Sequence, residues 1–199
     1  MWRCFLVILA ATGCGGSAAD PTTDAALGGD GPATGADASA GADQRLYPLA
    51  AGRSWTYDVT STYPSCPGGQ HEQRVVGTGM TDGRATFEVL GFCGLRGNVS
   101  VEGDRVEDYF TWGPKGWLRS LDEPVAAGHT WTTTNGSATF TMTYSAAGSV
   151  GAYPDCWKVT QNVSYTSYWI YCRGVGLVRY EMIDLGGGTI RAELRGKSF

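Results

Sequence analysis

Two histidines are the candidate general bases of this sequence. Nucleophilic catalysis needs a base held beside a serine or a cysteine, and the only imidazoles are His71 and His129. His71 lies in a segment rich in Gly and Gln, and His129 stands where a repeated motif has Arg53, which predicts an exposed position at a strand edge. The sequence has no G-x-S-x-G motif, the mark of one large class of hydrolases. We therefore predict no catalytic residues, and keep a hydrolase as an alternative function.

Four acidic residues form a second chemical candidate: Glu102, Asp104, Glu107 and Asp108. Clustered carboxylates can bind Ca²⁺, and two facing carboxylates can act as acid and base on a glycoside. Here the acidic residues alternate with Val101 and Val106 about Gly103, which is typical of a β-hairpin with one face in water. We therefore predict a solvated hairpin face.

No metal and no cofactor are predicted. A zinc site of cysteines usually contains a closely spaced pair, and the sequence has no C-x-x-C. The segment Gly174-Val175-Gly176 lacks the third glycine of a dinucleotide-binding loop, and the sequence around it does not predict the helix that should follow. The formal net charge is −4 and lysine is scarce, so we expect no nucleic-acid partner.

Aromatic side chains are the remaining candidates for binding. Our candidate ligand face consists of six of them: Trp112, Trp117, Trp157, Trp169, Tyr168 and Tyr171. A concave aromatic face suits an apolar ligand or a glycan. A glycine-rich β-domain with few Leu and Ile residues also needs large rings to fill its core, and we favour this second interpretation.

The elements that hold these residues belong to one part of the chain. Residues 15–44 contain five Asp, no other charged residue and no aromatic residue, so they cannot bury enough apolar surface to fold. Residues 46–199 carry 13 basic and 14 acidic residues and all ten Tyr. We predict a nearly neutral domain over residues 46–199, behind a disordered tether at residues 14–45.

The first 13 residues have the layout of a secretory signal peptide. A short positive start, Met1-Trp2-Arg3, precedes an apolar run at residues 5–11 that is too short to span a membrane as a helix. The segment Ala11-Thr12-Gly13-Cys14 resembles the lipobox of bacterial lipoproteins, although Ala11 stands where that pattern usually has Leu. The alternative is cleavage nearby by ordinary signal peptidase, which would release a soluble secreted protein.

The lipobox resemblance implies a membrane anchor. In bacterial lipoproteins the lipobox cysteine becomes the first residue of the mature protein and carries acyl chains such as palmitate, a role that falls here to Cys14. Glycines rather than Asp follow this cysteine, so the resemblance implies the outer membrane of the cell envelope, facing the periplasm or the exterior. The disordered tether predicted after Cys14 is what a surface anchor requires.

Four cysteines lie behind the predicted anchor: Cys66, Cys93, Cys156 and Cys172. An even number of cysteines in an exported domain predicts disulfides. Two alternating runs would form a hairpin about Ser164, in which Cys156 faces Cys172. A hairpin with its turn at residues 80–83 would return Cys93 to the start of its first strand, near Cys66. We predict the disulfides Cys66–Cys93 and Cys156–Cys172, each typically worth about 2–4 kcal/mol.

The fold predicted for the domain is all-β. Segments rich in Val, Thr, Tyr, Trp and Phe recur between turn residues, at 54–62, 73–78, 84–92, 98–102, 105–112, 117–120, 130–134, 138–144, 156–163, 165–172, 177–184 and 189–194. The short connections leave no room for parallel crossovers. We predict an antiparallel meander arranged as an open half-barrel or a sandwich, with a short helix only near residues 122–127.

An internal repeat divides the domain. The segment from Pro48 to Thr56, with Gly and Trp at fixed places, recurs 76 residues later from Pro124 to Thr132. A weaker similarity relates residues 109–119 to residues 169–179. Two similar halves and a recurrent hairpin pattern both explain these similarities.

The start and end of the domain resemble a group of bacterial secreted domains, the TapB-like domains. The opening Tyr47-Pro48-Leu49, followed by Gly52 and Trp55-Thr56-Tyr57, matches the start of their pattern, and residues 171–178 match its end. Cys172-Arg173 replaces an Ala-Pro pair that is common there. The resemblance covers nearly all of residues 46–199 and implies an antiparallel half-barrel, similar to the periplasmic carriers of lipoproteins. It implies no activity.

Taken together, the sequence predicts a membrane-anchored lipoprotein of the cell envelope that serves as a non-enzymatic binding or structural module. Its expected partners are the membrane, reached through Cys14, and an envelope protein or an apolar ligand. The alternative is an envelope hydrolase or a carrier of lipids or lipoproteins.

Overall fold

The computed structural model describes residues 43–111, 115–136, 138–162 and 166–199. The predicted signal peptide, Cys14, most of the predicted tether and Trp112 lie outside these residues. The described residues form twelve β-strands: β1 (Ser54–Ser61), β2 (Gly69–Thr81), β3 (Arg84–Leu90), β4 (Arg96–Glu102), β5 (Arg105–Phe110), β6 (Gly116–Leu121), β7 (Thr130–Thr134), β8 (Thr139–Val150), β9 (Tyr153–Asn162), β10 (Thr166–Cys172), β11 (Gly176–Ile183) and β12 (Thr189–Lys197). Each corresponds to one predicted segment. Residues 122–127 form bends and a turn instead of the predicted helix.

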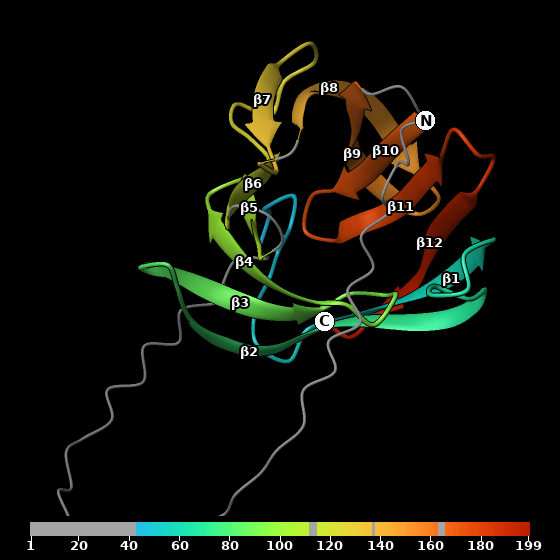
Figure 1. Cartoon of the computed structure of the whole chain (residues 1–199), viewed down its shortest axis with the longest axis horizontal. Coiled ribbons are helices and arrows are strands. Elements are labelled where there is room, and N and C mark those ends of the chain that lie inside the picture. Colours follow the sequence, from blue (N-terminus) through green and yellow to red (C-terminus); the bar gives the residue numbers. More distant parts are fainter. Residues whose placement is uncertain (1–42, 112–114, 137, 163–165) are drawn as a thin grey trace, which may run out of the picture. The chain divides into compact units, whose positions relative to one another are not determined.

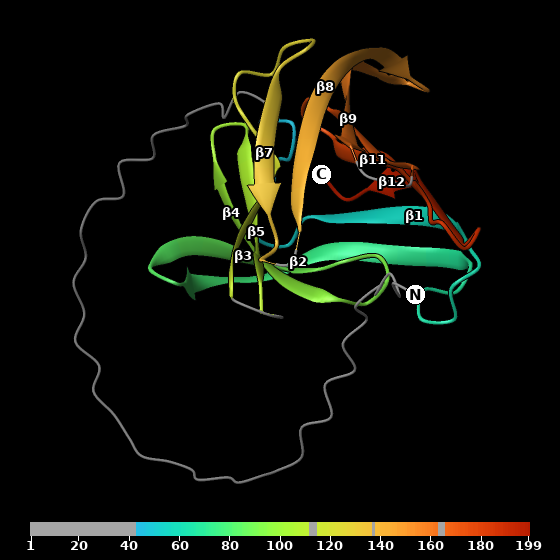
Figure 2. The ribbon, with the colours of Figure 1, turned by 45° about the horizontal axis from the view of Figure 1, so that its top comes forward.

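The twelve strands form one antiparallel meander (Figure 1). Their order is β6-β5-β4-β3-β2-β1-β12-β11-β10-β9-β8-β7, so each half of the chain supplies six consecutive strands and the pair β1–β12 joins the halves. The sheet curves until its two ends meet, and β7 lies next to the β4–β6 strands in both views (Figures 1 and 2). The result is a nearly closed barrel, which confirms the all-β antiparallel prediction.

Side-chain groups join the two ends of the sheet. The backbone amide of Arg119 on β6 donates to Thr133 Oγ1 on β7 at 2.8 Å. The indole Nε1 of Trp131 on β7 donates to the carbonyl oxygen of Arg119 at 3.0 Å. We call this contact between β6 and β7 the seam. A backbone ladder of seven residue pairs joins the halves on the other side, between β1 and β12.

The repeated motif forms the same turn in both halves. Arg53 N donates to Ala50 O at 3.1 Å before β1, and His129 N donates to Ala126 O, also at 3.1 Å, before β7. The glycine that precedes the donor has a positive φ in each turn, 79° and 82°. Glycine adopts this left-handed backbone conformation with little steric strain. The strong repeat therefore marks the first strand of each half.

The tryptophans of the repeat enter the core from both turns. Trp55 and Trp131 are 0% and 5% exposed, and each indole donates to a backbone carbonyl, that of Val175 at 2.6 Å and that of Arg119 at 3.0 Å. The weaker similarity has a different origin. It relates the β5–β6 hairpin to the β10–β11 hairpin, which occupy different positions in their halves.

Aromatic rings fill the space that the sheet encloses. Trp55, Tyr57 and Tyr144 are fully buried there, beside inward-facing valines such as Val159 and Val106. Burying one large apolar side chain contributes about 1.5–3 kcal/mol, so these rings stabilise the curved sheet from within.

A smaller core lies on the opposite face of β9–β11. It consists of Cys156, Ile170, Cys172, Val175 and Val178. Bulges in β8 on either side of Gly148 bend the long β8–β9 hairpin, and Val150 and Tyr153 near its end pack against this cluster.

Both predicted disulfides are present. Cys156 and Cys172 are direct partners in the β9–β10 ladder, and their Cα atoms are 4.0 Å apart. Cys66 and Cys93 link the β1–β2 connection to the β3–β4 connection, with a Cα–Cα distance of 4.9 Å.

Residues 43–52 form a segment that we call the N-terminal strap. Leu46 and Leu49 are buried in the main core. The Asp43 carboxylate accepts hydrogen bonds from Arg45 Nη2 at 2.7 Å and from Arg53 Nη1 at 2.9 Å. The folded part thus includes residues 43–45, which we predicted as tether, because two arginines hold Asp43.

The N-terminal strap binds both halves. Leu46 N donates to Asp104 Oδ1 in the β4–β5 turn at 2.8 Å. Gly174 N, in the β10–β11 turn, donates to the carbonyl oxygen of Arg45 at 3.1 Å. Arg173 connects the two turns, because its Nη1 donates to Asp104 Oδ2 at 2.7 Å.

Candidate ligand site

The two histidines have different surroundings from those predicted. His71 belongs to β2, and its Nε2 lies 2.7 Å from the carbonyl oxygen of Pro67. His129 is not an exposed strand-edge residue: its Nε2 lies 3.2 Å from Asp122 Oδ2, and its ring stacks on Trp131 with 5.8 Å between centroids. Within the described ranges, neither imidazole is hydrogen-bonded to a serine or a cysteine.

The acidic group does not share one solvated face. Glu102 and Glu107 lie on the outer face, whereas Asp104 binds Leu46 and Arg173. Asp108 pairs directly with Val99, a core residue, and directly opposed residues of an antiparallel ladder point to the same side. The prediction of a common wet face is therefore wrong for Asp104 and Asp108.

Asp108 is an acidic group on the core side of the sheet. Burial raises its pKa from 3.8 to about 6, and a hydrogen bond with Ser120 opposes part of this shift. Burial also raises the pKa of Tyr47, Tyr57 and Tyr171 above the ordinary value of a phenol, and the charge of Asp108 adds to the effect at Tyr47 and Tyr171. The interior therefore contains a polar group that holds a proton more readily than an exposed carboxylate.

The structure divides the candidate aromatic face between the two sides of the sheet. Trp157, Trp169 and Tyr171 pack in or against the main core. Tyr168 alternates with them and packs against the smaller core, where its hydroxyl donates to Glu181 at 2.7 Å. Trp117 lies on the outer face, beside Tyr109 at 5.0 Å between ring centroids. These five side chains do not form a single ligand face, and three of them serve the core.

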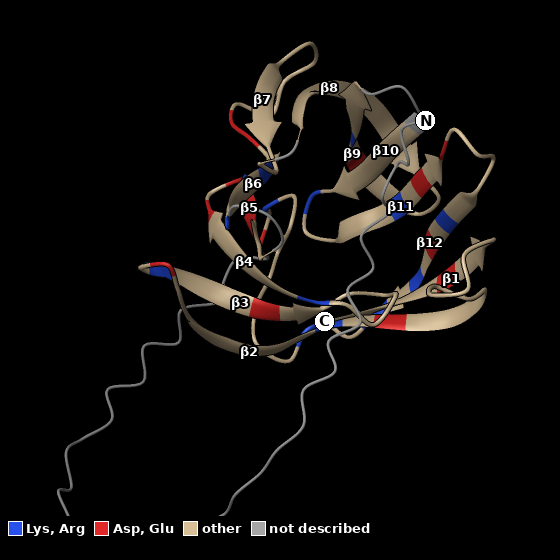
Figure 3. Cartoon of the chain, in the orientation of Figure 1, with Lys and Arg blue, Asp and Glu red and all other residues tan. Residues whose placement is uncertain are grey.

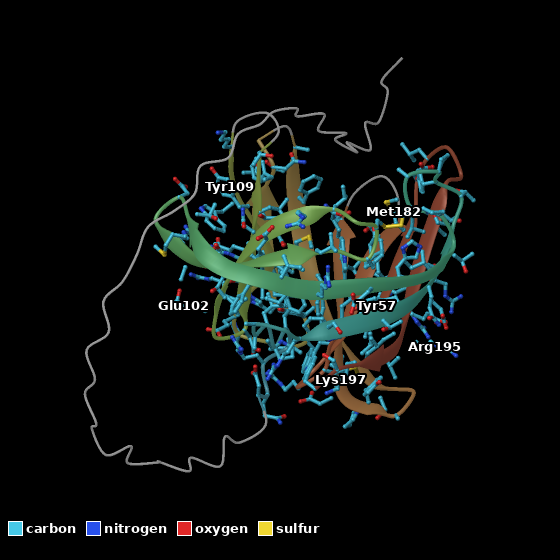
Figure 4. All side chains as sticks on the ribbon, turned by 90° about the horizontal axis from the view of Figure 1, so that it is seen from below. Tyr57, Glu102, Tyr109, Met182, Arg195 and Lys197 are labelled. Atoms are coloured by element: carbon cyan, nitrogen blue, oxygen red, sulfur yellow. A yellow bond between two sulfur atoms is a disulfide. The ribbon has the colours of Figure 1, made fainter. Side chains whose placement is uncertain are left out.

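A pocket opens on the outer face of the first half instead. We call it the arginine pocket; its volume is about 380 Å³, and its lining consists of Arg84, Ser100, Glu102, Arg105, Glu107 and Arg119. Figure 3 shows charged residues of both signs on β4–β6 and at the end of the β2–β3 hairpin. Figure 4 places Glu102 and Tyr109 on this side of the domain and Arg195 on the other side.

Strand register brings the pocket together. Ser100, Glu107 and Arg119 occupy one cross-strand row of β4, β5 and β6, and Glu102 faces Arg105 in the next row. Arg84 reaches this surface from the start of β3, where its Nη1 donates to Glu107 Oε2 at 2.5 Å. We did not predict this site, although pairing the alternating segments 98–102 and 105–112 would have placed its central residues side by side.

Two of the three arginines are fixed by neighbouring groups. The Arg84 guanidinium lies 4.7 Å from the centroid of the Trp117 ring, and the indole of Trp117 donates to Asp82 at 3.3 Å. Arg119 Nη1 donates to Asp122 Oδ1 at 3.3 Å. Asp122 thereby connects the arginine pocket to His129 at the seam.

Two guanidinium groups retain unused donors. Arg119 Nε is buried and, within the described structure, has no hydrogen-bond partner; Glu107 Oε1 is 3.8 Å away. Arg105 Nε lies 3.6 Å from Asp122 Oδ1, too far for a hydrogen bond. Arg105 can therefore donate further hydrogen bonds to a ligand, whereas Arg119 Nε is covered by protein in this arrangement.

Metal-binding clusters and long apolar helices are absent from the same residues. In the described ranges, no group of three or more His, Cys, Asp or Glu residues is placed to hold a metal ion. The same residues include no helix that is long and apolar enough to cross a membrane.

Comparison with known proteins gives a structural match. No protein-family model matches the chain, and no curated protein sequence matches it. A crystal structure described as that of "a putative lipoprotein from Parabacteroides distasonis" is similar to it with a TM-score of 0.42 and 12% sequence identity. The alignment covers 78% of this chain and 99% of that chain.

Proposed function

We propose that this chain is a lipid-anchored protein of the bacterial cell envelope and that its β-domain is a non-enzymatic binding module. The observation that carries the binding role is the arginine pocket, where guanidinium groups are held in place and keep unused hydrogen-bond donors. In ligand sites of this size, oriented polar groups fix the position of the ligand and supply specificity. The lining of the arginine pocket consists entirely of such polar and charged residues.

Two features support a location in the cell envelope. The sequence before the domain has the layout of a lipoprotein signal, with Cys14 as the acylated residue. The domain contains two disulfides, which form and persist in oxidising compartments outside the cytoplasm.

The packing of the interior favours a binding module over a carrier of lipids. A carrier needs space for acyl chains inside its curved sheet. Here Trp55, Tyr57 and Tyr144 fill that position and are fully buried. Moving them would expose or displace the rings that stabilise the fold.

The surroundings of His129 also favour binding over hydrolysis. Its Nε2 is engaged by Asp122, its ring stacks on those of Trp131 and Tyr144, and no serine or cysteine among the described residues is hydrogen-bonded to it. A general base must instead reach the proton that it removes from a nucleophile or water. If the protein is a hydrolase that uses this residue, His129→Ala abolishes activity against esters, glycans or peptides.

The anchor is tested by membrane fractionation of the expressed full chain. We expect wild type to sediment with membranes and Cys14→Ser to appear in the soluble fraction. Cys4→Ser is the matched control, since this cysteine lies in the same leader but outside the lipobox resemblance. Retention of Cys14→Ser in membranes, with an unchanged protein mass, would refute the anchor.

The binding role is tested by native mass spectrometry of the full chain released gently from membranes. We expect a bound small molecule or a partner, and we expect substitution of pocket arginines to remove it. A ligand-free protein that also gives no product on chemical crosslinking in cells would contradict the proposal.

A further inference from the structure

We propose that the arginine pocket binds a small polar oxoanion, specifically a carboxylate or phosphate carried on a hydroxyl-rich scaffold such as an acidic or phosphorylated sugar. This inference deepens the proposed function and rests on it. It follows from three guanidinium groups, contributed by β3, β5 and β6, that line one pocket beside a serine hydroxyl and an exposed carboxylate.

Internal ion pairs leave some of the guanidinium donors of the pocket unused. The lining has three arginines and two glutamates. Both oxygens of Glu107 already face arginines, with Oε2 2.5 Å from Arg84 and Oε1 3.8 Å from Arg119. A third carboxylate, that of Asp122, faces Arg105 Nε at 3.6 Å and Arg119 Nη1 at 3.3 Å. The Arg105 side chain still makes no hydrogen bond among the described residues, and the buried Nε of Arg119 has no partner there. A surplus of guanidinium donors favours an oxoanion, because the planar fork matches the oxygens of carboxylate and phosphate.

Two of the arginine side chains are held in place before any ligand binds. Arg84 is held between Glu107 and the face of Trp117, and Arg119 is held by Asp122. Immobilising a free arginine side chain opposes binding through lost rotamer entropy, and that cost is smaller where the chain is already fixed. The arginine pocket is therefore prepared for a charged ligand rather than assembled by it.

The lining also offers polar groups to the remainder of the ligand. Ser100 and the exposed Glu102 add a hydroxyl and an acceptor carboxylate to the lining. Hydroxyl groups can donate to Glu102 while an anionic group accepts from Arg105, so a ligand with both kinds of group matches the site. A volume of about 380 Å³ lies at the lower end of the range for small-molecule sites, which suits a ligand of monosaccharide size.

Aromatic stacking does not dominate this site. The Trp117 ring lies next to the pocket, and the Arg84 guanidinium covers one face of it. A neutral sugar or an apolar ligand would leave the guanidinium donors unmatched while displacing their water. We therefore assign the site to an anionic ligand.

The test uses nuclear magnetic resonance of the nitrogen-15-labelled full chain purified in mild detergent. Glucuronate, a glucose phosphate, inorganic phosphate and glucose are titrated as separate probes, and the Nε–Hε signals of arginine side chains are followed. The Arg119 signal is identified by its loss in Arg119→Lys. We expect this signal to shift with glucuronate or with the glucose phosphate, and not with glucose.

Substitutions then locate the binding. Arg105→Gln should weaken binding of the shifted probe about tenfold, the usual effect of losing one hydrogen bond to a charged group. Arg195→Gln is the matched control, because Arg195 is an exposed arginine paired with Asp58 on the other side of the domain. The side chain of Arg105 makes no hydrogen bond in the described structure, so its substitution keeps the test valid if Arg119 variants fail to fold.

The outcomes separate the ligand class from the general function. A shift with inorganic phosphate alone would show that the anion suffices and would overturn the sugar scaffold. Equal binding of glucose, or unchanged affinity in Arg105→Gln, would overturn the oxoanion assignment, as would the absence of any shift. If a ligand is still found on the purified protein by mass spectrometry in that last case, the binding function stands and only the ligand class fails.

Discussion

The indole Nε1 of Trp131 donates a hydrogen bond to the carbonyl oxygen of Arg119 at 3.0 Å, and this bond crosses from the last strand of the first half to the first strand of the second. The equivalent junction on the other side is the β1–β12 ladder. The sheet edges of the two halves therefore meet in two ways, through a backbone ladder on one side and through side chains that include Trp131 and Thr133 on the other.

Removing the indole donor should loosen the seam. Trp131→Phe leaves the Arg119 carbonyl without this partner and reduces the buried ring, which we expect to lower the free energy of unfolding by about 1–3 kcal/mol. Amide hydrogen exchange should accelerate in β6 and β7 and remain slow in β1 and β12. Trp157→Phe is the control, since Trp157 is also a hydrogen-bonded indole but lies on β9. Equal acceleration across all four strands would contradict a localised seam.

The Asp43 carboxylate should stabilise the domain only when it is ionised. The hydrogen bond from Arg45 is the main cause that lowers its pKa from 3.8 to about 2, with Arg53 contributing. Because the pKa is lower in the folded chain, the stabilisation is complete above about pH 4 and is lost as the pH falls through about 2.

The substitution Asp43→Asn removes this charge and tests its contribution. Near pH 7 we expect it to lower the free energy of unfolding by about 1–2 kcal/mol, allowing for partial exposure of the ion pairs. Urea denaturation should show the two proteins converging as the pH approaches about 2. A difference that stays constant over this range would show that the charge of Asp43 is not what holds the N-terminal strap.

The ionised Asp108 carboxylate should destabilise the folded domain, the opposite of the effect of Asp43. Its pKa is about 6 in the folded chain and 3.8 ordinarily, so between these values the folded state binds more protons than the unfolded state. The free energy of unfolding therefore falls as the pH rises through this window, by at most about 3 kcal/mol. Asp108→Asn should be more stable than wild type near pH 7 and similar to it below about pH 4. Urea denaturation at both pH values measures this, and a less stable variant at the higher pH would refute the assignment.

Gly176 should tolerate no side chain. Its φ is 99°, and a Cβ built there would lie 3.0 Å from Nε1 of Trp55. We expect Gly176→Ala to lower the free energy of unfolding by about 1–3 kcal/mol through backbone strain and displacement of the ring. Gly196→Ala is the control, because a Cβ at that position would have no other atom within 4 Å. Thermal unfolding that is equal for both variants would argue against this close approach.

Local pattern was enough to predict the strands and the disulfides. Alternation and turn residues located all twelve strands, since both signals are carried within a few neighbouring residues. The pairing of Cys156 with Cys172 followed from counting residues on either side of one turn. These are properties of single hairpins, which do not depend on how the sheet curves.

Features that depend on curvature were not predictable in this way. Alternation shows that Asp108 and Glu107 face opposite sides, but only the closed sheet shows that the side of Asp108 is the interior. The sequence around His129 predicts exposure because it does not reveal Asp122, which approaches from the end of β6 across the seam. The centre of the arginine pocket follows from pairing segments 98–102 and 105–112, but the contribution of Arg84 does not, since it reaches Glu107 from a strand that is not its neighbour.

The N-terminal strap also determines how the domain would bear mechanical load. A pull on the chain ahead of Asp43 reaches the Asp43–Arg45 pair first. From there it divides between Asp104, which holds Leu46 in one half, and Gly174, which holds Arg45 in the other. Tension applied there would thus be shared by two turns, one in each half, before it reached β1, the strand that follows the strap.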